Sequence, residues 1–225
     1  MIDTMERVEL SPTQMAAAAP VLELSAWCSS RSKRAIDVIV AGLLAPFAVI
    51  GVAFTALVSA MSFRGWPFFL QDRTGLGGGR IRIIKVRSLP RDWDPTVGKH
   101  RLQEDEFSAV SHFIRANHLD ELPQFANVFA GSMSLVGPRP MIDDVLELLE
   151  DDVRDRRHAV KPGLSGLWQV STMGSLSLDE CPELDLAYIE NASRRVDLCI
   201  LWWTLTRRQV DSEFLLQWVR SHNVK

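Results

Sequence analysis

Residues 115–140 read R-A-N-H-L-D-E-L-P-Q-F-A-N-V-F-A-G-S-M-S-L-V-G-P-R-P, and we expect the rest of the chain to be organised around them. The centre of this stretch predicts a helix start, because Asp120 can cap free backbone N–H groups, Pro123 falls in the first turn and Gly131 ends the segment. Apolar residues recur at helical spacing and predict a stripe that faces a core: Leu122, Phe125, Ala126 and Phe129. Asp120 and Glu121 would then lie at the positive end of a helix dipole.

The acidic pair at this helix start has two interpretations. A helix N-terminus also suits a phosphate, but two carboxylates would repel one unless a cation intervenes. Mg²⁺ is the usual bridge between carboxylates and phosphate oxygens, and Asp120 and Glu121, flanked in sequence by Arg115 and Arg139, could hold one. In an isolated Asp-Glu pair, a capped helix with a solvated acidic first turn would explain the same residues.

Length and composition set wider limits. With 225 residues, 47% of them hydrophobic and 24% charged, the chain suits one folded domain with accessory segments. Its formal net charge of −3 gives no reason to expect nucleic acid. The three cysteines form no C-x-x-C pair, which favours free thiols in a reducing compartment. The five histidines lack the spacing of transition-metal ligands.

An apolar segment from Val38 to Met61 is the candidate membrane element. At about 1.5 Å per residue it could just cross a hydrocarbon core of about 30 Å, so its length favours a spanning helix. Pro46 frees a backbone carbonyl in the middle of the run, between Gly42 and Gly51, and favours a helix that bends and re-enters instead. Basic residues stand at both ends, so charge does not select an orientation. Residues 1–32, which precede it, predict a mobile tail.

Residues 66–89 predict two strands around a glycine turn. The glycines do not form a phosphate loop, because G-x-G-x-x-G fails at Arg80 and no G-K-[ST] follows. Lys85 and Arg87 are two residues apart on the second strand, hence on one face and about 6.6 Å apart. Two cations so placed could hold a diphosphate, or could simply guard an exposed edge strand.

Three further helical regions are predicted. A short helix before Asp120 carries Arg115, and residues 141–157 form an amphipathic helix with an acidic outer face. From about Leu184 the chain is helical again. There I-L-W-W-T-L lies between pairs of arginines, which suits either an interfacial membrane helix or a core helix with buried tryptophan.

Several strings occur together and in one order: K-R-A-I-D-V, Q-D-R-T-G, K-V-R-S, L-D-E-L-P-Q, S-L-V-G-P-R-P, K-P-G-L-S-G-L-W-Q-V and D-L-A-Y-I-E-N-A-S. In this combination the chain resembles the bacterial sugar transferases, the monotopic polyprenyl-phosphate phosphoglycosyl transferases, in their minimal catalytic form. The resemblance extends from about Lys33 to about Arg208. Each string alone is a weak signal, whereas their shared order makes the match specific.

The resemblance implies an α+β, mostly helical fold in which residues 33–64 form a re-entrant membrane helix hairpin. Residues 65–225 would form a cytoplasmic catalytic domain with a small β-hairpin and interfacial amphipathic helices, on the cytoplasmic face of the bacterial inner (plasma) membrane. It also implies transfer of a sugar 1-phosphate from a UDP-sugar to polyprenyl (undecaprenyl) phosphate, with release of UMP, as the initiating step of exopolysaccharide or other glycoconjugate synthesis. Membrane lipid would be a partner, and the resemblance leaves a homodimer open.

The resemblance assigns roles to specific residues. Asp120 would be the nucleophile that forms a covalent phosphosugar intermediate, Glu121 would bind Mg²⁺ beside it, and Arg115 would be a catalytic contact. The expected substrate-binding residues are Lys85, Arg87, Pro138, Arg139 and Pro140.

The chain also departs from the family pattern. It has His118 where the family commonly has Ser, Ala45 before Pro46 where the family has Ser, and Met173 where an Arg usually stands. Asp185 and Tyr188 match a family segment without an assigned role. These departures leave open a catalytically degenerate member that scaffolds a complex or binds lipid.

Overall fold

The computed structural model describes residues 24–89, 108–175 and 181–222. The predicted tail of residues 1–32 therefore lies largely outside the described residues. Its described end forms a short 3₁₀ helix, η1 (Ala26–Ser29). Ser25 fixes this turn to the C-terminal part of the chain, because its N–H donates to the carbonyl of Ile189 (2.9 Å) and its hydroxyl to that of Ala192 (2.5 Å). The division of the chain into tail, membrane element and catalytic domain stays a prediction.

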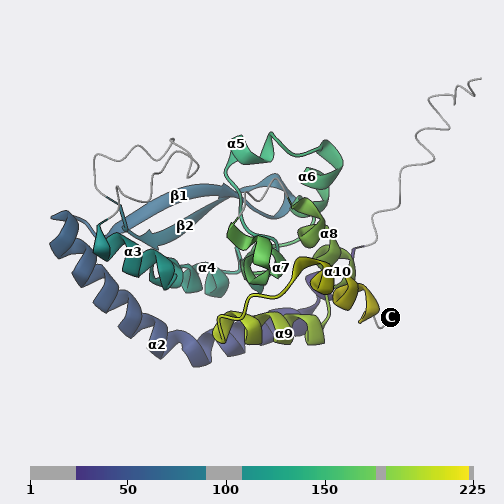
Figure 1. Ribbon diagram of the computed structural model, residues 1–225, viewed down its shortest axis with the longest axis horizontal. Helices are drawn as coiled ribbons and strands as arrows, with labels where there is room; N and C mark the ends of the chain where they lie inside the picture. Colours follow the sequence, from purple (N-terminus) through teal and green to yellow (C-terminus); the bar gives the residue numbers. More distant parts are fainter. Residues whose placement is uncertain (1–23, 90–107, 176–180, 223–225) are drawn as a thin grey trace, which may run out of the picture.

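The apolar segment is one continuous helix, α2 (Arg31–Phe63), which Ser30 caps by accepting from the N–H of Lys33. Figure 1 shows that α2 bends near its middle, with the rest of the fold on its concave side. Pro46 lies in this region of the helix and explains the bend, because it has no N–H and its ring crowds the carbonyl one turn earlier. By length and composition α2 could cross a membrane.

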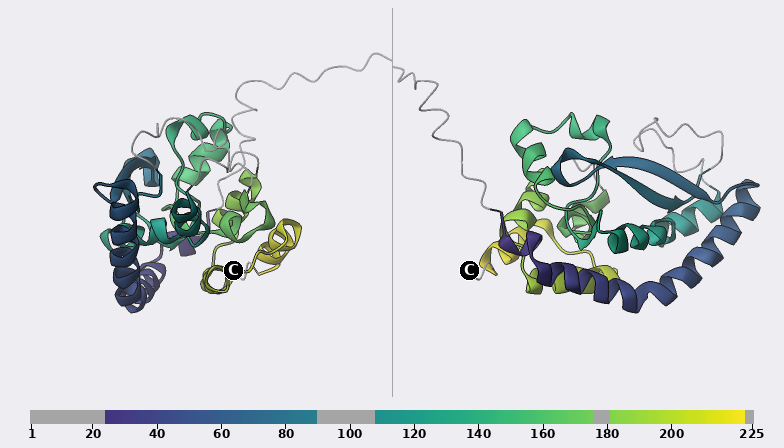
Figure 2. Two further views of the ribbon diagram at one scale, coloured as in Figure 1. Left: turned by 60° about the vertical axis from the view of Figure 1, so that its left-hand side comes forward. Right: turned by 180° about the vertical axis from the view of Figure 1, so that it is seen from behind.

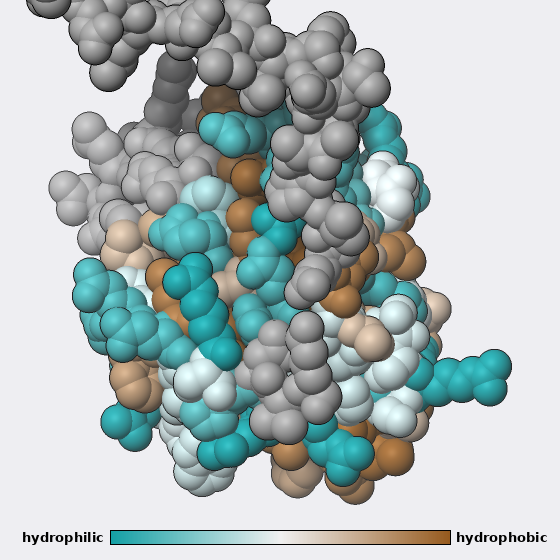
Figure 3. All heavy atoms as spheres, turned by 90° about the vertical axis from the view of Figure 1, so that its right-hand side faces the viewer, coloured by the Kyte–Doolittle hydropathy of each residue, from teal (hydrophilic) through white to brown (hydrophobic). Residues whose placement is uncertain are grey.

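In α2 polar side chains face the protein and large apolar side chains face outward, the opposite of the arrangement in a helix on the surface of a soluble protein. Small and polar side chains are buried: Lys33, Asp37, Ala41, Ala48, Thr55 and Ser59. Large apolar side chains are exposed: Val38, Ile39, Leu43, Phe47, Val49, Ile50, Phe54, Leu57 and Met61. Hydrophobic residues also reach the surface along the lower margin of Figure 3, the level at which α2 and α9 lie in Figure 1. An exposed apolar face of this size is typical of a surface that contacts a membrane or another protein.

The predicted hairpin is confirmed. Strands β1 (Phe68–Thr74) and β2 (Arg80–Val86) pair antiparallel, with Gln71 opposite Ile83. The 3₁₀ turn η2 (Leu76–Gly78) joins them, and Gly77 and Gly78 have positive φ angles of 67° and 72° there. These glycines therefore serve the turn, since residues with a side chain rarely adopt that conformation.

The segment around Asp120 differs from the prediction. Helix α3 (Ala109–Ala116) leads into a 3₁₀ helix, η5 (Leu119–Gln124), and an α-helix, α4 (Phe125–Ala130), follows only then. Asp120 therefore lies in the first turn of η5, and the cap position belongs to His118. Pro123 has no N–H for an α-helical hydrogen bond, which accounts for the tighter turn.

The predicted core-facing stripe on this segment is partly wrong. Phe125 packs against the core, but Ala126 and Phe129 are exposed, and the chain buries Asn127 and Val128 instead. The change from 3₁₀ to α-helix alters the number of residues per turn, so one helical spacing cannot hold across both.

The predicted helix over residues 141–157 is also divided in two, α5 (Asp143–Leu146) and α6 (Asp151–His158). Acidic residues crowd the break, and Asp151 and Asp152 favour a second helix N-terminus because they complement its dipole. The apolar stripe itself holds, since Leu146 and Leu149 belong to one buried cluster with Met141.

The rest of the chain builds the core around a short parallel pair, β3 (Ser134–Val136) and β4 (Gly163–Ser165). Their backbones approach so closely that a Cβ on Gly163 would lie 2.1 Å from the nitrogen of Gly137. Five helical segments complete the fold: α7 (Leu167–Val170), η6 (Thr172–Ser175), α8 (Pro182–Asn191), α9 (Arg194–Leu205) and α10 (Ser212–Ser221). The predicted α+β, mostly helical class is confirmed.

A buried polar network joins the start of α2 to α9, and both helices lie below the hairpin in Figures 1 and 2. Lys33 and Asp197 form an ion pair at 2.6 Å, and the indole N–H of Trp27 donates to the same carboxylate (2.8 Å). On the same face of α2, Asp37 accepts from the hydroxyl of Ser134 (2.7 Å) at the start of β3. These contacts fix the apolar helix against the domain that carries the acidic pair.

Candidate active site

Glu121 lies between two cations from opposite ends of the site. Its Oε1 accepts from Lys85 Nζ at 2.9 Å and from Arg139 Nη2 at 2.7 Å, and its side chain is only 13% exposed. Burial alone would raise the pKa of Glu121, but the charges and hydrogen bonds of Arg139 and Lys85 hold it well below its usual range. Glu121 is therefore ionised, and it brings β2 and the residues after β3 together.

Asp120 has a different environment. Burial raises its pKa, and the charge of Glu121 adds to this effect. Lys85 and Arg115 oppose the rise, as does a backbone hydrogen bond. Within the described parts of the chain, Asp120 takes part in no ion pair. Its carboxylate thus stays available beside a strongly paired one.

Several close contacts place the acidic pair. A Cβ on Gly51 of α2 would lie 2.7 Å from Leu122 Cδ1, so this glycine lets the bent helix approach η5 closely. On the other side, Asn127 of α4 donates to the carbonyl of Arg82 in β2 at 2.8 Å. The acidic pair is therefore held between the apolar helix and the hairpin.

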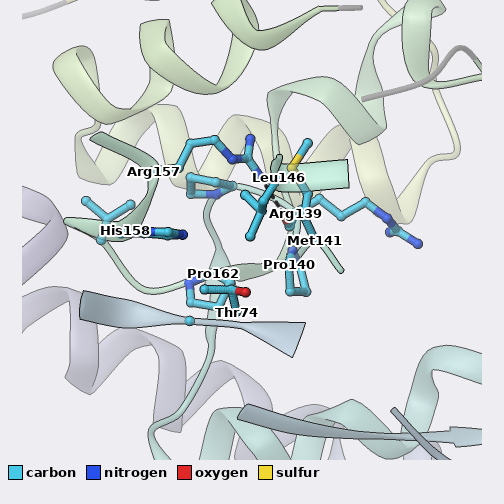
Figure 4. A pocket seen from close by; sticks show the side chains of 11 residues that line it. Thr74, Arg139, Pro140, Met141, Leu146, Arg157, His158 and Pro162 are labelled. Carbon is cyan, nitrogen blue, oxygen red and sulfur yellow. Dashed lines mark hydrogen bonds between the residues drawn. The ribbon is translucent and has the colours of Figure 1, made fainter. Parts of the chain in front are cut away.

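The turn Pro138–Pro140 is held from behind by a buried pair on α6 and α8. Arg157 Nη2 donates to the carbonyl of Arg139 at 2.6 Å, and the Arg157 guanidinium pairs with Asp185. Figure 4 shows Arg157 beside a small cavity at this turn, while the Arg139 side chain extends away from it. That side chain also lies over the ring of Trp168, 5.8 Å from its centroid. Asp185 thus supports the turn from which Arg139 reaches Glu121.

Tyr188, the other residue without an assigned role, is fully buried. Its hydroxyl lies 3.0 Å from the carbonyl of Val136 and 2.8 Å from Asp197. It therefore links the end of β3 to the network that fixes α2, which is a structural position rather than one in the site.

The structure brings most, but not all, of the predicted site residues together. Lys85 and Arg139 contact Glu121, and Arg115 contributes charge at Asp120. Arg87 lies beyond the end of β2, where its Nε donates to the carbonyl of Trp66 (3.4 Å) and its guanidinium lies over Phe69. The roles expected of these residues stay predictions.

Two of the three departures from the family pattern, His118 and Met173, also have clear positions. His118 adopts a left-handed conformation with φ of 52° before η5, and its side chain is exposed. Met173 packs against the hydrophobic core from η6. The position at which the family usually carries an arginine therefore contributes to packing in this chain.

Sequence reasoning gave no role to Arg73 of β1, although it lies within the quoted string Q-D-R-T-G. The charges of Arg139 and Glu121 both act on its guanidinium, so it belongs to the same site. The alternation of side chains between the two faces of a strand could have indicated Arg73. Arg73 lies on the same face as Phe69, and the partner of Phe69 across the hairpin is Lys85.

The residues present fit a magnesium ion shared with a substrate. Within the described ranges, no group of three His, Cys, Asp or Glu residues could hold a metal by itself. Mg²⁺, however, commonly takes one or two carboxylates and completes its shell with water and phosphate oxygens. Among the residues that the structure describes, Asp120 forms no ion pair, and Glu121 Oε2 has a long contact with Arg139 Nη1 at 3.5 Å.

Comparison with known proteins identifies the class to which this fold and site belong. The profile of a family described as "Bacterial sugar transferase" matches residues 28–210. The chain therefore belongs to the bacterial sugar transferase family, and the predicted family and the prediction of an enzyme are confirmed.

Three relatives illustrate the family. The chain is 36% identical to an uncharacterized sugar transferase of Bacillus subtilis over 187 residues, 82% of this chain and 90% of that one. It is 35% identical over 210 residues to a UDP-glucose:undecaprenyl-phosphate glucose-1-phosphate transferase of Caulobacter vibrioides, covering 88% and 78%. It is 34% identical over 193 residues to a UDP-galactose-lipid carrier transferase of Erwinia amylovora, covering 77% of this chain but 39% of that longer protein.

Proposed function

We propose that this chain transfers a sugar 1-phosphate from a UDP-sugar to polyprenyl phosphate. The observation that carries the proposal is the pair of adjacent carboxylates at η5: Glu121 is bound by Lys85 and Arg139, while Asp120 remains available beside it. Relatives named as undecaprenyl-phosphate sugar-phosphate transferases support the same donor and acceptor. Such a step would begin the assembly of an exopolysaccharide or another glycoconjugate.

The proposed chemistry has two displacements at one phosphorus atom. In the first, an Asp120 carboxylate oxygen bonds to the β-phosphorus of the donor, the bond to the bridging oxygen breaks, and UMP leaves with that oxygen. In the second, an oxygen of the lipid phosphate bonds to the same phosphorus and the bond to Asp120 breaks, which leaves a polyprenyl diphosphate sugar. Covalent catalysis divides one difficult transfer between two bulky anions into two easier steps.

The other residues of the site serve charge and position. Phosphoryl transfer needs cations close to the non-bridging oxygens more than it needs a base. Lys85 and Arg115 oppose the effect of burial on Asp120, which favours its nucleophilic, ionised form. Glu121 and Asp120 would hold Mg²⁺, which when bound supplies further positive charge at the phosphates. Arg139, on its proline-flanked turn, would bind the nucleotide side of the donor.

The exposed apolar faces of two helices support a proposal for the membrane arrangement. The apolar face of α2 is accompanied by Leu198, Trp202 and Leu205 of α9, which are 49%, 64% and 66% exposed. A tryptophan among aliphatic side chains, with arginines at the helix ends, suits the membrane–water interface. We propose that α2 enters the cytoplasmic leaflet of the bacterial plasma membrane and returns, with α9 in the interface.

Release of UMP from a panel of UDP-sugars, with undecaprenyl phosphate and Mg²⁺, tests the proposal. We expect release with at least one donor, and loss of release when Mg²⁺ is chelated. The alternative, a degenerate member that scaffolds a complex or binds lipid, rests on Met173 and His118, which stand where the family usually has Arg and Ser. A folded, membrane-bound protein that releases no UMP from any donor in the panel would support that alternative.

A further inference from the structure

Arg73 is a cation of the site for which the mechanism above provides no role. It lies on β1, and its side chain shares one face of the hairpin with Gln71 and Phe69, because alternate residues of a strand point the same way. Lys85 pairs with Phe69 and lies on that face as well. One face of the hairpin therefore carries both Arg73 and the lysine that binds Glu121.

The partners of the Arg73 guanidinium are neutral oxygens. Its Nε and Nη2 donate to Gln71 Oε1 at 3.2 and 2.6 Å, and its Nη1 lies 3.5 Å from the carbonyl of Pro140. No carboxylate in the described portion of the chain forms an ion pair with it. A guanidinium has five N–H donors, so these three contacts leave two donors for another acceptor.

Backbone contacts fix this position. The next residue, Thr74, donates its N–H to the carbonyl of Met141 at 3.1 Å and its hydroxyl to Asp143 at 2.8 Å. The end of β1 is thereby attached to the residues that follow the Pro138–Pro140 turn. The fold therefore places the backbone of Arg73 beside this turn.

The surroundings make an anion the missing partner. Burial and the charge of Arg139 lower the pKa of Arg73 to about 10, with Glu121 opposing them, so the guanidinium is still charged at neutral pH. A half-buried cation beside a second cation is unfavourable unless an anion compensates it. The carboxylate of Glu121 cannot do so alone, since Lys85 and Arg139 already share its Oε1.

We infer that Arg73 binds the diphosphate of the nucleotide-sugar donor, on the side of Arg139 away from Lys85. Four residues along β1 separate Arg73 from Phe69, the partner of Lys85, a distance of about 13 Å. Lys85 and Arg139 both contact Glu121, and Arg73 starts from a point further along the strand, so the three side chains together could reach both phosphate groups of a donor diphosphate. The inference rests on the proposed function, and it adds a binding residue for the donor.

Binding of UDP and of uridine to the full chain in detergent, measured by calorimetry, separates a phosphate contact from support of the turn. We expect Arg73→Gln to weaken UDP binding roughly 10- to 100-fold, the effect of losing a hydrogen bond to a charged group, and to leave uridine binding unchanged. Arg73→Lys keeps the charge without the planar fork and should recover part of the loss. Arg82→Gln is the matched control, because Arg82 lies on the same hairpin but is exposed, and within the described ranges its one ion pair is with Asp72.

Three results would overturn the inference. Equal losses of UDP and uridine affinity would mean that Arg73 only supports the turn. An unchanged UDP affinity combined with a raised KM for polyprenyl phosphate would place the lipid phosphate there instead. If Arg73→Gln binds UDP as tightly as the wild type does, this inference is refuted and the proposed function is unaffected. If the wild type neither binds UDP nor releases UMP, the proposed function itself is refuted.

Discussion

Asp185→Asn tests whether the buried pair behind the Pro138–Pro140 turn positions Arg139. The substitution keeps the shape of the side chain but removes its charge, and the Arg157 and Asp185 side chains are only 4% and 1% exposed. A buried guanidinium without its carboxylate costs about 3–5 kcal/mol. For a chain of this size that loss lowers Tm by roughly 6–20 °C, which differential scanning fluorimetry of the detergent-solubilised protein would detect.

Loss of stability alone would not show that the pair positions Arg139, so a second variant is needed. Arg157→Met with Asp185→Leu replaces both charges by apolar groups of similar volume, and such replacements are often neutral or stabilising. The double variant nevertheless lacks the 2.6 Å hydrogen bond from Arg157 to the Arg139 carbonyl. We expect a Tm near that of the wild type together with a donor KM raised roughly 10-fold, the effect of a misplaced charged contact. A wild-type KM in the double variant, or an unchanged Tm in Asp185→Asn, would refute the reasoning.

Three further outcomes are expected. Gly163→Ala should lower the free energy of unfolding, measured by chemical denaturation, by about 3 kcal/mol or more, because the added Cβ would collide with backbone atoms. Gly42→Ala is the control: its added Cβ has no atom within 4 Å, so the free energy of unfolding should be unchanged or slightly higher. Burial raises the pKa of the Cys28 thiol to about 12, so a maleimide at pH 8 should label it only slowly until the protein is unfolded, and rapid labelling in the folded protein would contradict this. In a protein without native cysteines, single cysteines placed at Ser29 and Ser62 flank the apolar run of α2. If the helix re-enters, an impermeant maleimide should label neither cysteine in intact spheroplasts and both after lysis. Labelling of one cysteine before lysis would mean that α2 spans the membrane.

The elements that sequence reasoning predicted correctly are those with a strong local signal. The apolar run of α2 and the glycine-centred hairpin depend on composition over many residues, and both are present. The bend at Pro46 was equally local, because the missing N–H acts within one turn.

The errors arise where neighbours along the chain compete or where distant segments meet. The acidic residues after Leu146 divide a helix that its apolar spacing alone would continue, and Pro123 replaces an expected α-helical turn by a 3₁₀ turn. The site shows the second limit. Lys85 could be predicted near Glu121 from the family resemblance, but the contact of Arg73 with Pro140 and the pairing of Asp185 with Arg157 join distant parts of the chain, and no local pattern indicates them.

The covalent intermediate on Asp120 is the central claim of the proposed mechanism, and intact-protein mass spectrometry tests it most directly. The wild-type chain is incubated with the UDP-sugar donor and Mg²⁺ but without polyprenyl phosphate, so that the second displacement cannot occur. We expect an adduct with the mass of one sugar phosphate on the wild type, its loss when the lipid phosphate is added, and no adduct on Asp120→Asn, which keeps the shape of the side chain but cannot form the acyl phosphate. An Asp120→Asn variant that carries the adduct or turns over at the wild-type rate would contradict the account.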